Sequence, residues 1–355
     1  MSLADPSTAR SVPSVAPVAE GPALAAYLAQ HDATTPFHDP RWCRAIEQGC
    51  GHGYHLLGAT NDAGGLVGYL PLTHVRSRLF GDALVSSAFA VGGGIIADDA
   101  ATAGALADAA WAIAQRLDVD SVELRGGTAP GDTWARDDAT YAGFVADLAA
   151  DDAAQLLAIP RKQRAEVRKS LDGSLTVGRG GDRDEGAAHY AVYAESVRNL
   201  GTPVFPRCLF SAVLKLFGEE ADILTIYDGR NPVASVLSLY HRGTVMPYWG
   251  GGTAAARSLR ANERLYYELM LHARRRGCTR FDFGRSKLGT GAYTYKKNWG
   301  FEPTPLTYYA RNADGQGPRS INPLDAKYRL QVAAWKKLPL PIANRIGPLI
   351  ARGLG

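Results

Sequence analysis

Several features that would identify a protein class are absent from this sequence of 355 residues. Its four cysteines are too few for a disulfide framework in a chain of this length. No apolar run approaches the roughly 18 to 20 residues that a membrane-spanning helix needs. The first 35 residues are rich in Ala, Pro and Ser but lack the basic and apolar regions of a signal peptide. We therefore expect a cytoplasmic protein.

Strong bulk charge and the common nucleotide-binding motifs are missing as well. The formal net charge is only +4, so the composition does not by itself indicate a nucleic-acid-binding protein. Neither a Walker motif nor a dinucleotide-binding fingerprint occurs. No Cys-x-x-Cys pair supports a zinc site, and we expect no metal, although four candidate ligands are close in sequence: Cys43, Cys50, His52 and His55.

The sequence does contain a pattern of strands and helices long enough for two domains, with a hydrophobic content of 46%. The first half predicts helices over 40–49 and 100–117 and strands over 54–59, 66–72, 83–89 and 121–124. The second half predicts a helix pair over 151–171 interrupted near Pro160, helices over 186–199 and 258–276, and strands over 223–227, 233–240, 245–249 and 280–283.

Two landmarks recur at nearly one offset. The glycine runs that start at Gly92 and Gly250 lie 158 residues apart (250 − 92), and the acids Glu123 and Asp282 lie 159 apart (282 − 123). This favours an internal duplication of a mixed α/β unit over coincidence in a glycine-rich chain. We expect an α/β (α+β) fold with these parts: a disordered leader over 1–20, units over 21–150 and 151–315, and an amphipathic tail over 316–355.

The stretch from Thr279 to Pro303 concentrates the residues suited to chemistry. A short strand pattern over 280–283 is followed by a Gly-, Ser- and Thr-rich run that is too irregular for a helix or strand. Two tyrosines, two lysines and a tryptophan then fall between Tyr293 and Gly300. Because α/β folds place their chemistry where strands end, we expect the functional site here.

Several long phrases resemble the FemAB-like group of the GNAT acyltransferase superfamily, and within it the branch associated with exosortase/PEP-CTERM exopolysaccharide loci. The resemblance covers the chain from about residue 36 onwards. It rests on PRKQRAEVRKS (160–170), SVRNLGTPVFP (196–206), FDFGRSKLGTGAYTYKKNWGFEP (281–303), NPLDAKYRL (322–330) and AAWKKLPLPIANRIGPLI (333–350).

The resemblance implies two tandem GNAT-like domains, each a mixed, mostly antiparallel sheet flanked by helices. FemAB-type relatives move an aminoacyl group from charged tRNA to an amine of a peptidoglycan precursor, whereas similar proteins are thought to use acyl-CoA. The implied reaction is transfer of an acyl or aminoacyl group to an amine of a cell-envelope or exopolysaccharide precursor. The donor would be a substrate, and no bound cofactor is expected.

The resemblance also implies a functional lysine. The family's aromatic-Lys-x-x-aromatic-Gly signature matches Tyr295 to Gly300 and makes Lys296 the counterpart of the lysine that stabilises an oxyanion or the donor's phosphate. Tyr295 belongs to the same predicted centre. This chain departs from the pattern by a second lysine, Lys297, so the sequence leaves open which of the two faces the site.

Acyl transfer needs a deprotonated amine and a stabilised oxyanion. Asp282 is a candidate to accept the amine proton or orient the nucleophile; the alternative is a structural acid bonded to a helix N-terminus or to Arg285. Arg285 and Lys287 are candidates for phosphate binding in a Gly/Ser loop, or else belong to a simple surface loop.

Further candidates for donor or substrate binding lie elsewhere, and each has a structural alternative. Two basic residues on a predicted helix form either a phosphate site or a solvated face, and a polar cluster either contacts substrate or caps a helix. A tyrosine either stacks on a ligand or packs in the core, and two glycines either allow a donor to approach closely or belong to a loop. These candidates are Arg161 and Arg164; Arg198, Asn199 and Thr202; Tyr248; Gly250 and Gly251.

A second hypothesis makes the chain a non-catalytic assembly protein that binds a nucleotide-sugar or a partner from the exopolysaccharide machinery. The tail over 328–350 is amphipathic and broken by Pro339 and Pro341. In either hypothesis this tail is a candidate contact with a partner or the membrane surface.

Overall fold

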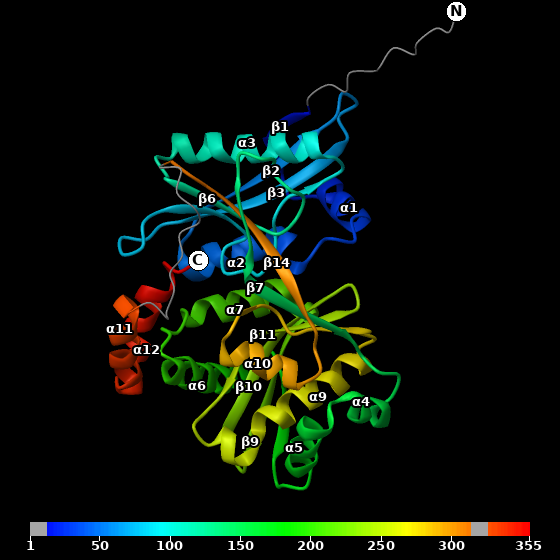
Figure 1. The fold of residues 1–355 in the computed structure, drawn as a ribbon, viewed down its shortest axis with the longest axis vertical. Coiled ribbons are helices and arrows are strands. Elements are labelled where there is room, and N and C mark those ends of the chain that lie inside the picture. The colour runs from blue at the N-terminus through cyan, green and yellow to red at the C-terminus, as the bar shows by residue number, and fades with distance from the viewer. Residues whose placement is uncertain (1–12, 314–325) are drawn as a thin grey trace, which may run out of the picture.

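The computed structural model describes residues 13–313 and 326–355, which form two lobes (Figure 1). The N-lobe contains β1 (Ser14–Pro17), α1 (Pro22–Gln30), α2 (Pro40–Cys50), β2 (Tyr54–Thr60), β3 (Leu66–Val75), β4 (Ala83–Ser86), β5 (Ile96–Ala97), α3 (Ala100–Arg116) and β6 (Ser121–Arg125). The C-lobe contains α4 (Asp152–Ala158), α5 (Arg161–Leu171), β8 (Thr176–Gly180), α6 (Arg183–Leu200), α7 (Arg207–Phe217), β9 (Ala221–Asp228), β10 (Asn231–His241), β11 (Thr244–Gly252), α8 (Ala256–Leu259), α9 (Ala261–Arg275), β12 (Arg280–Asp282), β13 (Ser286–Lys287) and α10 (Gly291–Asn298).

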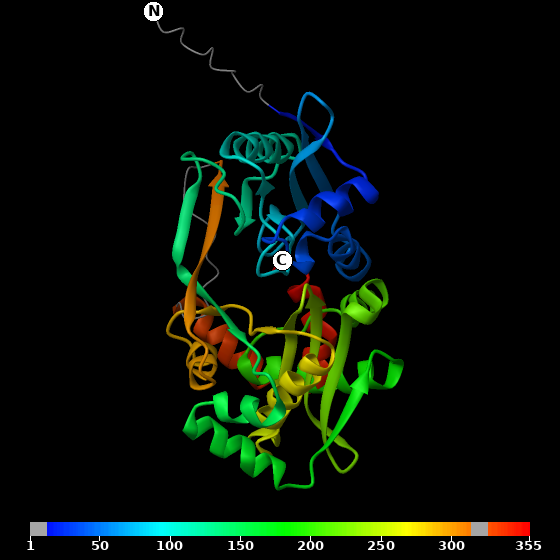
Figure 2. The ribbon, with the colours of Figure 1, turned by 90° about the vertical axis from the view of Figure 1, so that its right-hand side faces the viewer.

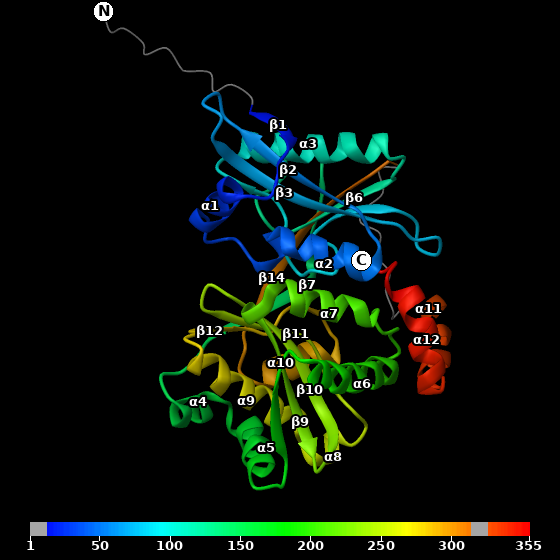
Figure 3. The same ribbon diagram turned by 180° about the vertical axis from the view of Figure 1, so that it is seen from behind.

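One mixed sheet runs through both lobes in the order β1-β2-β3-β4-β6-β14-β7-β12-β11-β10-β9-β8. Neighbouring strands on this path are antiparallel, except for the parallel pairs β4/β6 and β11/β12. Each lobe carries helices beside its part of the sheet (Figure 3). The predicted mixed, mostly antiparallel α/β fold is confirmed.

Two long strands, β7 (Ala135–Asp147) and β14 (Pro303–Asn312), pair with each other and pass between the lobes (Figure 2). Although β14 comes late in the chain, it pairs with β6 of the N-lobe, whereas β7 pairs with β12 of the C-lobe. Each of the units predicted over 21–150 and 151–315 thus contributes one strand to the sheet of the other: β7 from the first and β14 from the second. Backbone hydrogen bonds of these strands hold the lobes together.

Local sequence signals account for several element boundaries. Asp39 caps α2 by accepting a hydrogen bond from the Arg41 amide at 2.8 Å, and Pro40 starts the helix. Gly51, with φ 77°, ends it. The side chain of Asn61 accepts hydrogen bonds from the Ala63 and Gly65 amides, which closes the β2–β3 hairpin. The predictions of this helix and this hairpin are confirmed.

Some local predictions were wrong. The disordered leader predicted over 1–20 is contradicted at Ser14–Pro17, because β1 pairs with β2 and Val15 packs on the N-lobe core; residues 1–12 lie outside the described part. The sequence pattern also did not predict β7, because its charges do not alternate with apolar residues. Backbone pairing on both edges holds that strand instead.

The lobes also pack through α2 and α7. The Cβ that a side chain would add at Gly49 would lie 2.4 Å from the Leu209 Cα, so the two helices approach as closely as glycine allows. Nearby, the fully buried ring of Trp42 stacks on Trp249 of β11 at 5.6 Å between centroids. This contact fixes the N-lobe against the strand that borders the candidate site.

The tail forms α11 (Ala326–Lys336) and α12 (Leu340–Ala351), which pack beside α6 (Figure 3). The residues after α12 cross to the N-lobe, where Arg125 Nη2 donates a hydrogen bond to the Gly355 carbonyl oxygen at 2.8 Å. Among the helices described in the structure, none combines the length and apolar character needed to cross a bilayer.

Candidate active site

The parallel pair β11/β12 separates along its length, and a cavity lies beyond the point of separation. The strands are joined at Val245 and Phe281, after which β11 continues along β10 and β12 along β7. The cavity is lined from β11 by Tyr248 and Gly250, and from the other side by residues that follow β12. Diverging parallel strands thus leave a space at their carboxyl ends.

The matching pair β4/β6 in the N-lobe differs beyond the strands, because the loop after β4 turns back onto β6. The Gly94 amide donates to the Arg125 carbonyl oxygen at 3.0 Å, and the Thr128 amide to the Ile95 carbonyl oxygen at 2.8 Å. A Cβ at Gly94 would lie 1.9 Å from the Gly126 carbonyl oxygen, so the closure requires glycine. The first glycine run therefore closes its lobe, whereas the second borders the cavity.

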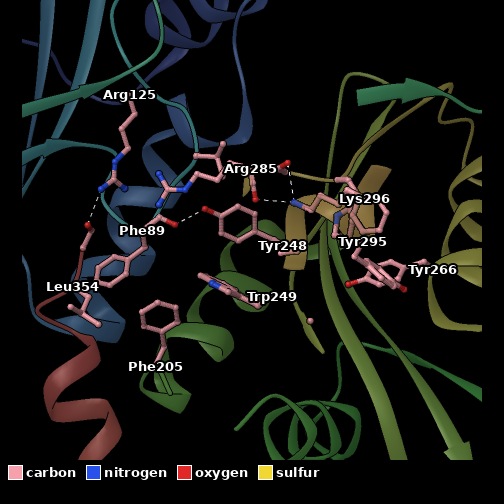
Figure 4. Close-up of a pocket in the computed structure, with 17 residues that line it drawn as sticks. Phe89, Arg125, Phe205, Tyr248, Trp249, Tyr266, Arg285, Tyr295, Lys296 and Leu354 are labelled. Atoms are coloured by element: carbon pink, nitrogen blue, oxygen red, sulfur yellow. Dashed lines mark hydrogen bonds between the residues drawn. The ribbon is translucent and has the colours of Figure 1, made fainter. Parts of the chain in front are cut away.

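The cavity has a volume of about 380 Å³ and lies between the lobes (Figure 4). One wall is aromatic and the other carries cations. Its lining residues are Phe89, Val91, Arg125, Phe205, Pro247, Tyr248, Trp249, Gly250, Tyr266, Phe283, Gly284, Arg285, Ala292, Tyr295, Lys296, Leu354 and Gly355. A concave space that combines aromatic walls with a few convergent charges is typical of a small-molecule site.

Lys296 lies on α10 and points at this cavity (Figure 4). Its Nζ donates hydrogen bonds to the carbonyl oxygens of Gly284 and Arg285 at 3.1 and 2.8 Å, and lies 5.6 Å from the centre of the Phe283 ring. Burial lowers the pKa of Lys296 to about 8; the negative charge of Asp282 opposes this shift and Arg285 adds to it.

The helix α10 explains which of the two lysines faces the site. Thr290 caps it by accepting a hydrogen bond from the Tyr293 amide, and Tyr295 and Lys296 are turned towards the cavity. Lys297, the next residue, is exposed and does not line the cavity. Successive residues of a helix point about 100° apart, which separates these neighbours.

Asp282 lies at the end of β12 but does not line the cavity. Its Oδ1 accepts a hydrogen bond from the Gly284 amide at 2.8 Å, which shapes the turn that presents the carbonyls bound by Lys296. Burial raises the pKa of Asp282, while the Gly284 amide and the charge of Lys296 oppose the shift. Asp282 therefore supports the position and charge of Lys296 from behind.

Tyr295 contributes a hydroxyl group to the site. This hydroxyl is buried and has no hydrogen bond of normal geometry to another described residue. Burial raises its pKa well above the ordinary value, so the group is a protonated donor at neutral pH. Its ring packs among those of Tyr266, Phe283 and Trp299, which fixes its direction.

Arg285 joins this cavity to a second one. Its Nη1 donates to the Tyr308 hydroxyl at 2.8 Å, and its guanidinium lies 4.8 Å from the centre of the Tyr141 ring. The second cavity, of about 640 Å³, lies beside β7 and β14. Both cavities are bordered by the same four residues: Arg125, Arg285, Leu354 and Gly355.

Arg125 lies on the border that the two cavities share, and only 5% of its surface is exposed. It donates hydrogen bonds to Glu123 Oε1 at 2.6 Å and to the carbonyl oxygens of Ala90 and Gly355 at 2.9 and 2.8 Å. Glu123 is ion-paired with it, and the side chains of Arg285 and Lys296 add two further positive charges at the same cavity. An anionic ligand is favoured there.

Two strained backbone positions lie in the N-lobe loop that borders the cavity. The backbones of Ser87 and Phe89 are left-handed, with φ 48° and 60°, a conformation that residues other than glycine rarely adopt. The Phe89 carbonyl oxygen accepts a hydrogen bond from the Tyr248 hydroxyl at 2.5 Å, and the Phe89 side chain lines the cavity. Such strain persists only where the surroundings enforce it and is common at functional sites.

Some predicted site residues are brought together and others are not. Lys296, Tyr295, Arg285, Tyr248 and Gly250 line the cavity, with Asp282 behind them. The remaining predicted binding residues do not line it: Arg161, Arg164, Arg198, Asn199, Thr202, Gly251, Lys287 and Lys297.

Three of these remaining residues have structural roles away from the cavity. Arg164 caps α4 by donating to the Leu157 carbonyl oxygen at 2.9 Å, on a helix that packs against α9. Arg198 donates to the Lys336 carbonyl oxygen at 3.1 Å and so holds the tail. A Cβ at Gly251 would lie 2.2 Å from Ser196 Oγ, so this glycine allows α6 to pack on β11.

The sequence analysis missed Arg125, Phe89 and Phe205. Arg125 lies two residues after Glu123, the acid that marks the duplication, and that proximity was the one signal that pointed to it. No local pattern marks the two phenylalanines, because the docking of the two lobes brings them to the cavity.

Comparison with known proteins places this site within a recognised domain. Residues 160–297 match the family model described as "Acetyltransferase (GNAT) domain", and the match includes Asp282, Arg285 and Lys296. No curated protein sequence matches the chain.

Solved structures with similar folds extend over most of the chain. FemX superposes with a TM-score of 0.60 at 13% identity, covering 80% of this chain and 94% of FemX. L-PGS from Bacillus licheniformis gives 0.53 at 12% identity, with 89% and 96% covered. A tandem GNAT protein from the clavulanic acid biosynthesis pathway gives 0.55 at 11% identity, with 87% and 100% covered. At these identities the likeness concerns the fold alone. Residues 160–297 thus match the GNAT acetyltransferase domain, and the chain has a fold similar to that of FemX and of a tandem GNAT protein.

Proposed function

We propose that the protein is an acyltransferase that moves an acyl or aminoacyl group to an amine of a cell-envelope or exopolysaccharide precursor. The observation that carries the proposal is the placement of the Lys296 ammonium and the Tyr295 hydroxyl on one cavity at the separating strands of the GNAT domain. The envelope context rests on the motifs that resemble FemAB-like proteins.

In the proposed reaction the acceptor amine attacks the carbonyl carbon of the donor. A C–N bond forms, and the C–S bond of a thioester or the C–O bond of an aminoacyl ester breaks. Lys296 stabilises the tetrahedral oxyanion, or the phosphate of the donor, with its positive charge. Tyr295 donates the proton that the leaving sulfur or oxygen needs, and the proton released by the amine restores it through solvent. Asp282 supports Lys296 and does not contact the substrates.

The two cavities suit a reaction with two substrates. We propose that the donor occupies the 380 Å³ cavity beside Lys296 and that the acceptor enters through the 640 Å³ cavity beside β7. The substrates would meet at the border formed by Arg125 and Arg285. These cations favour an acceptor that carries a carboxylate or phosphate near its amine.

The donor is proposed to be an acyl-CoA or a charged tRNA, and the setting to be the cytoplasm, with the tail contacting a partner or a membrane surface. The cavity wall offers cations for a phosphate-bearing donor of either kind. The basic helix α5, with Arg161 and Arg164, carries positive charge that would contribute to tRNA binding, but it does not line the cavity.

The test is binding of the purified protein to an acyl-CoA and to charged tRNA over a salt series, followed by a single-turnover assay with the donor that binds. CoA binding at the cavity should weaken in Lys296→Met and be unchanged in Arg161→Gln/Arg164→Gln. If the donor is tRNA, its binding should depend steeply on salt, weaken in Arg161→Gln/Arg164→Gln and be unchanged in Lys296→Met. Absence of binding to both donors would reject the acyltransferase proposal in favour of a non-catalytic assembly role.

A further inference from the structure

The outer face of α12 is apolar and has no covering element among the described residues. Ile342, Ile346 and Leu349 are 48%, 38% and 60% exposed. Their spacings of four and three residues place them on one face of the helix. The opposite face is packed against the C-lobe, where Ala343 and Gly347 are buried and a Cβ at Gly347 would lie 3.0 Å from the Val204 amide nitrogen.

The charged residues of the segment that carries this face all have one sign. From residue 330 to 355 the sequence contains no Asp or Glu, and its four basic residues are Lys336, Lys337, Arg345 and Arg352. All four are exposed. Arg345 lies three residues after Ile342, at the flank of the apolar face, and Lys336 and Lys337 lie at the end of α11, three to four residues before α12 begins. Leu330 on α11 is a further exposed apolar residue of the tail, with 80% of its surface exposed.

We propose that this face, which consists of Ile342, Ile346, Leu349 and the basic residues around them, rests on the surface of an anionic lipid bilayer. A helix with apolar residues on one side and only positive charges at its flank is suited to the boundary between headgroups and acyl chains. Basic residues next to a bilayer gain from its negative surface potential.

Other occupants fit the charges less well. In a symmetric dimer formed through this face, each copy would bring the same basic residues towards those of its partner. That like-charge arrangement opposes self-association. None of the cavities described in the structure is lined by Ile342, Ile346 or Leu349, whereas the anchoring side chains of a protein partner are typically buried in pockets.

The position of α12 gives the contact a consequence for the candidate site. The helix ends at Ala351, and Leu354, three residues later, borders both cavities. Three residues span at most about 10 Å of extended chain. A bilayer bound at α12 would thus lie near the cavity border, which suits an acceptor presented at a lipid surface. This consequence rests on the proposed acyl transfer, whereas the lipid contact itself does not.

The experiment is flotation of the full-length protein with vesicles of phosphatidylcholine, with and without phosphatidylglycerol, at low and high salt. We expect binding to the anionic vesicles only, weakened by salt. The triple variant Ile342→Ser/Ile346→Ser/Leu349→Ser should lose about tenfold or more in vesicle affinity, since the binding strength of an interfacial helix scales with the apolar area that it buries in the bilayer. The matched control Leu79→Ser/Leu157→Ser changes two residues that are 70% and 62% exposed elsewhere, and should bind as the wild type does.

Three results would overturn the proposal: no binding to anionic vesicles, equal binding by the triple variant, or light scattering that shows a dimer which the triple variant dissociates. Lys336→Gln/Lys337→Gln is a second variant that keeps the apolar face and should lower affinity for anionic vesicles. The Lys296→Met variant should bind vesicles as the wild type does, because Lys296 lies away from α12. If the wild type binds vesicles but transfers no acyl group, the proposed function is rejected and the lipid contact is not.

Discussion

The ammonium group of Lys296 donates a hydrogen bond to the carbonyl oxygen of Arg285 at 2.8 Å. This bond joins α10 to the turn after β12 and holds two cations on the same cavity. Because the carbonyl accepts from the ammonium, the lysine is kept at the cavity wall despite its burial. The relationship defines which side chains should matter for activity.

Replacing Lys296 by methionine should lower kcat/KM by at least about 100-fold, since removal of one group that stabilises an oxyanion has effects of this size. The control is Lys297→Met, which removes the same charge one residue later from an exposed position and should leave the rate near that of the wild type. Steady-state kinetics with the identified donor measure both. Equal losses in the two variants would contradict the assignment of Lys296.

The rate should fall as the pH rises through about 8, because the pKa of Lys296 lies there and its charged form is the one proposed to act. Lys296→Arg keeps a positive charge at higher pH and should remove this decline. The measurement is kcat/KM against pH for both proteins. A wild-type rate that instead increases through pH 8 would mean that the neutral amine is the active form.

Arg285→Lys should lower kcat/KM by about tenfold, which corresponds to about 1.4 kcal/mol, because lysine keeps the charge but loses the fork that bonds Tyr308. Arg230→Lys is the matched control, since Arg230 is exposed and borders neither cavity. Kinetics at varied acceptor concentration separate binding from turnover. An unchanged Arg285→Lys enzyme would argue against a role for the guanidinium.

Gly49→Ala should destabilise the protein by about 1 to 3 kcal/mol, because the added methyl group would overlap Leu209 where α2 meets α7. Gly53→Ala is a suitable control, since its Cβ would meet nothing within 4 Å. Urea unfolding midpoints measure the difference. If both variants unfold alike, the close contact between the lobes is not rigid.

Stability should decrease as the pH falls from about 6.5 towards 3. Burial lowers the pKa of His189 to about 3, so below 6.5 the unfolded chain binds a proton that the folded protein does not. In the folded state, the neutral Nδ1 of His189 lies 3.1 Å from Ser235 Oγ.

The check is the free energy of unfolding between pH 6.5 and 4 for the wild type and His189→Gln. The variant should lose less stability over this range, because it lacks the titrating group; the buried His38, whose pKa burial lowers to about 4, contributes equally to both proteins. Parallel losses in the two proteins would show that His189 titrates normally.

The sequence by itself determined those parts of the protein that depend on neighbours along the chain. Asp39, Pro40 and Gly51 start and end α2, and Asn61 closes its hairpin, because caps and turns are made by residues a few positions apart. The region over 280–300 was also identified as the site, since a strand end and a dense polar run are local features. The phase of the following helix, and hence the choice of Lys296 over Lys297, required the structure.

Only the tertiary structure decided how the cavity is completed. Arg125 bonds a carbonyl 230 residues away, and Tyr308 of β14 bonds Arg285 and Val91 from opposite lobes. The basic helix over 161–171 and the cluster at Arg198 have the composition of binding sites, yet packing directs them elsewhere. The reason is that these contacts depend on how β7 and β14 join the lobes and on the docking of α2 against α7, and no local pattern in the sequence encodes those long-range distances.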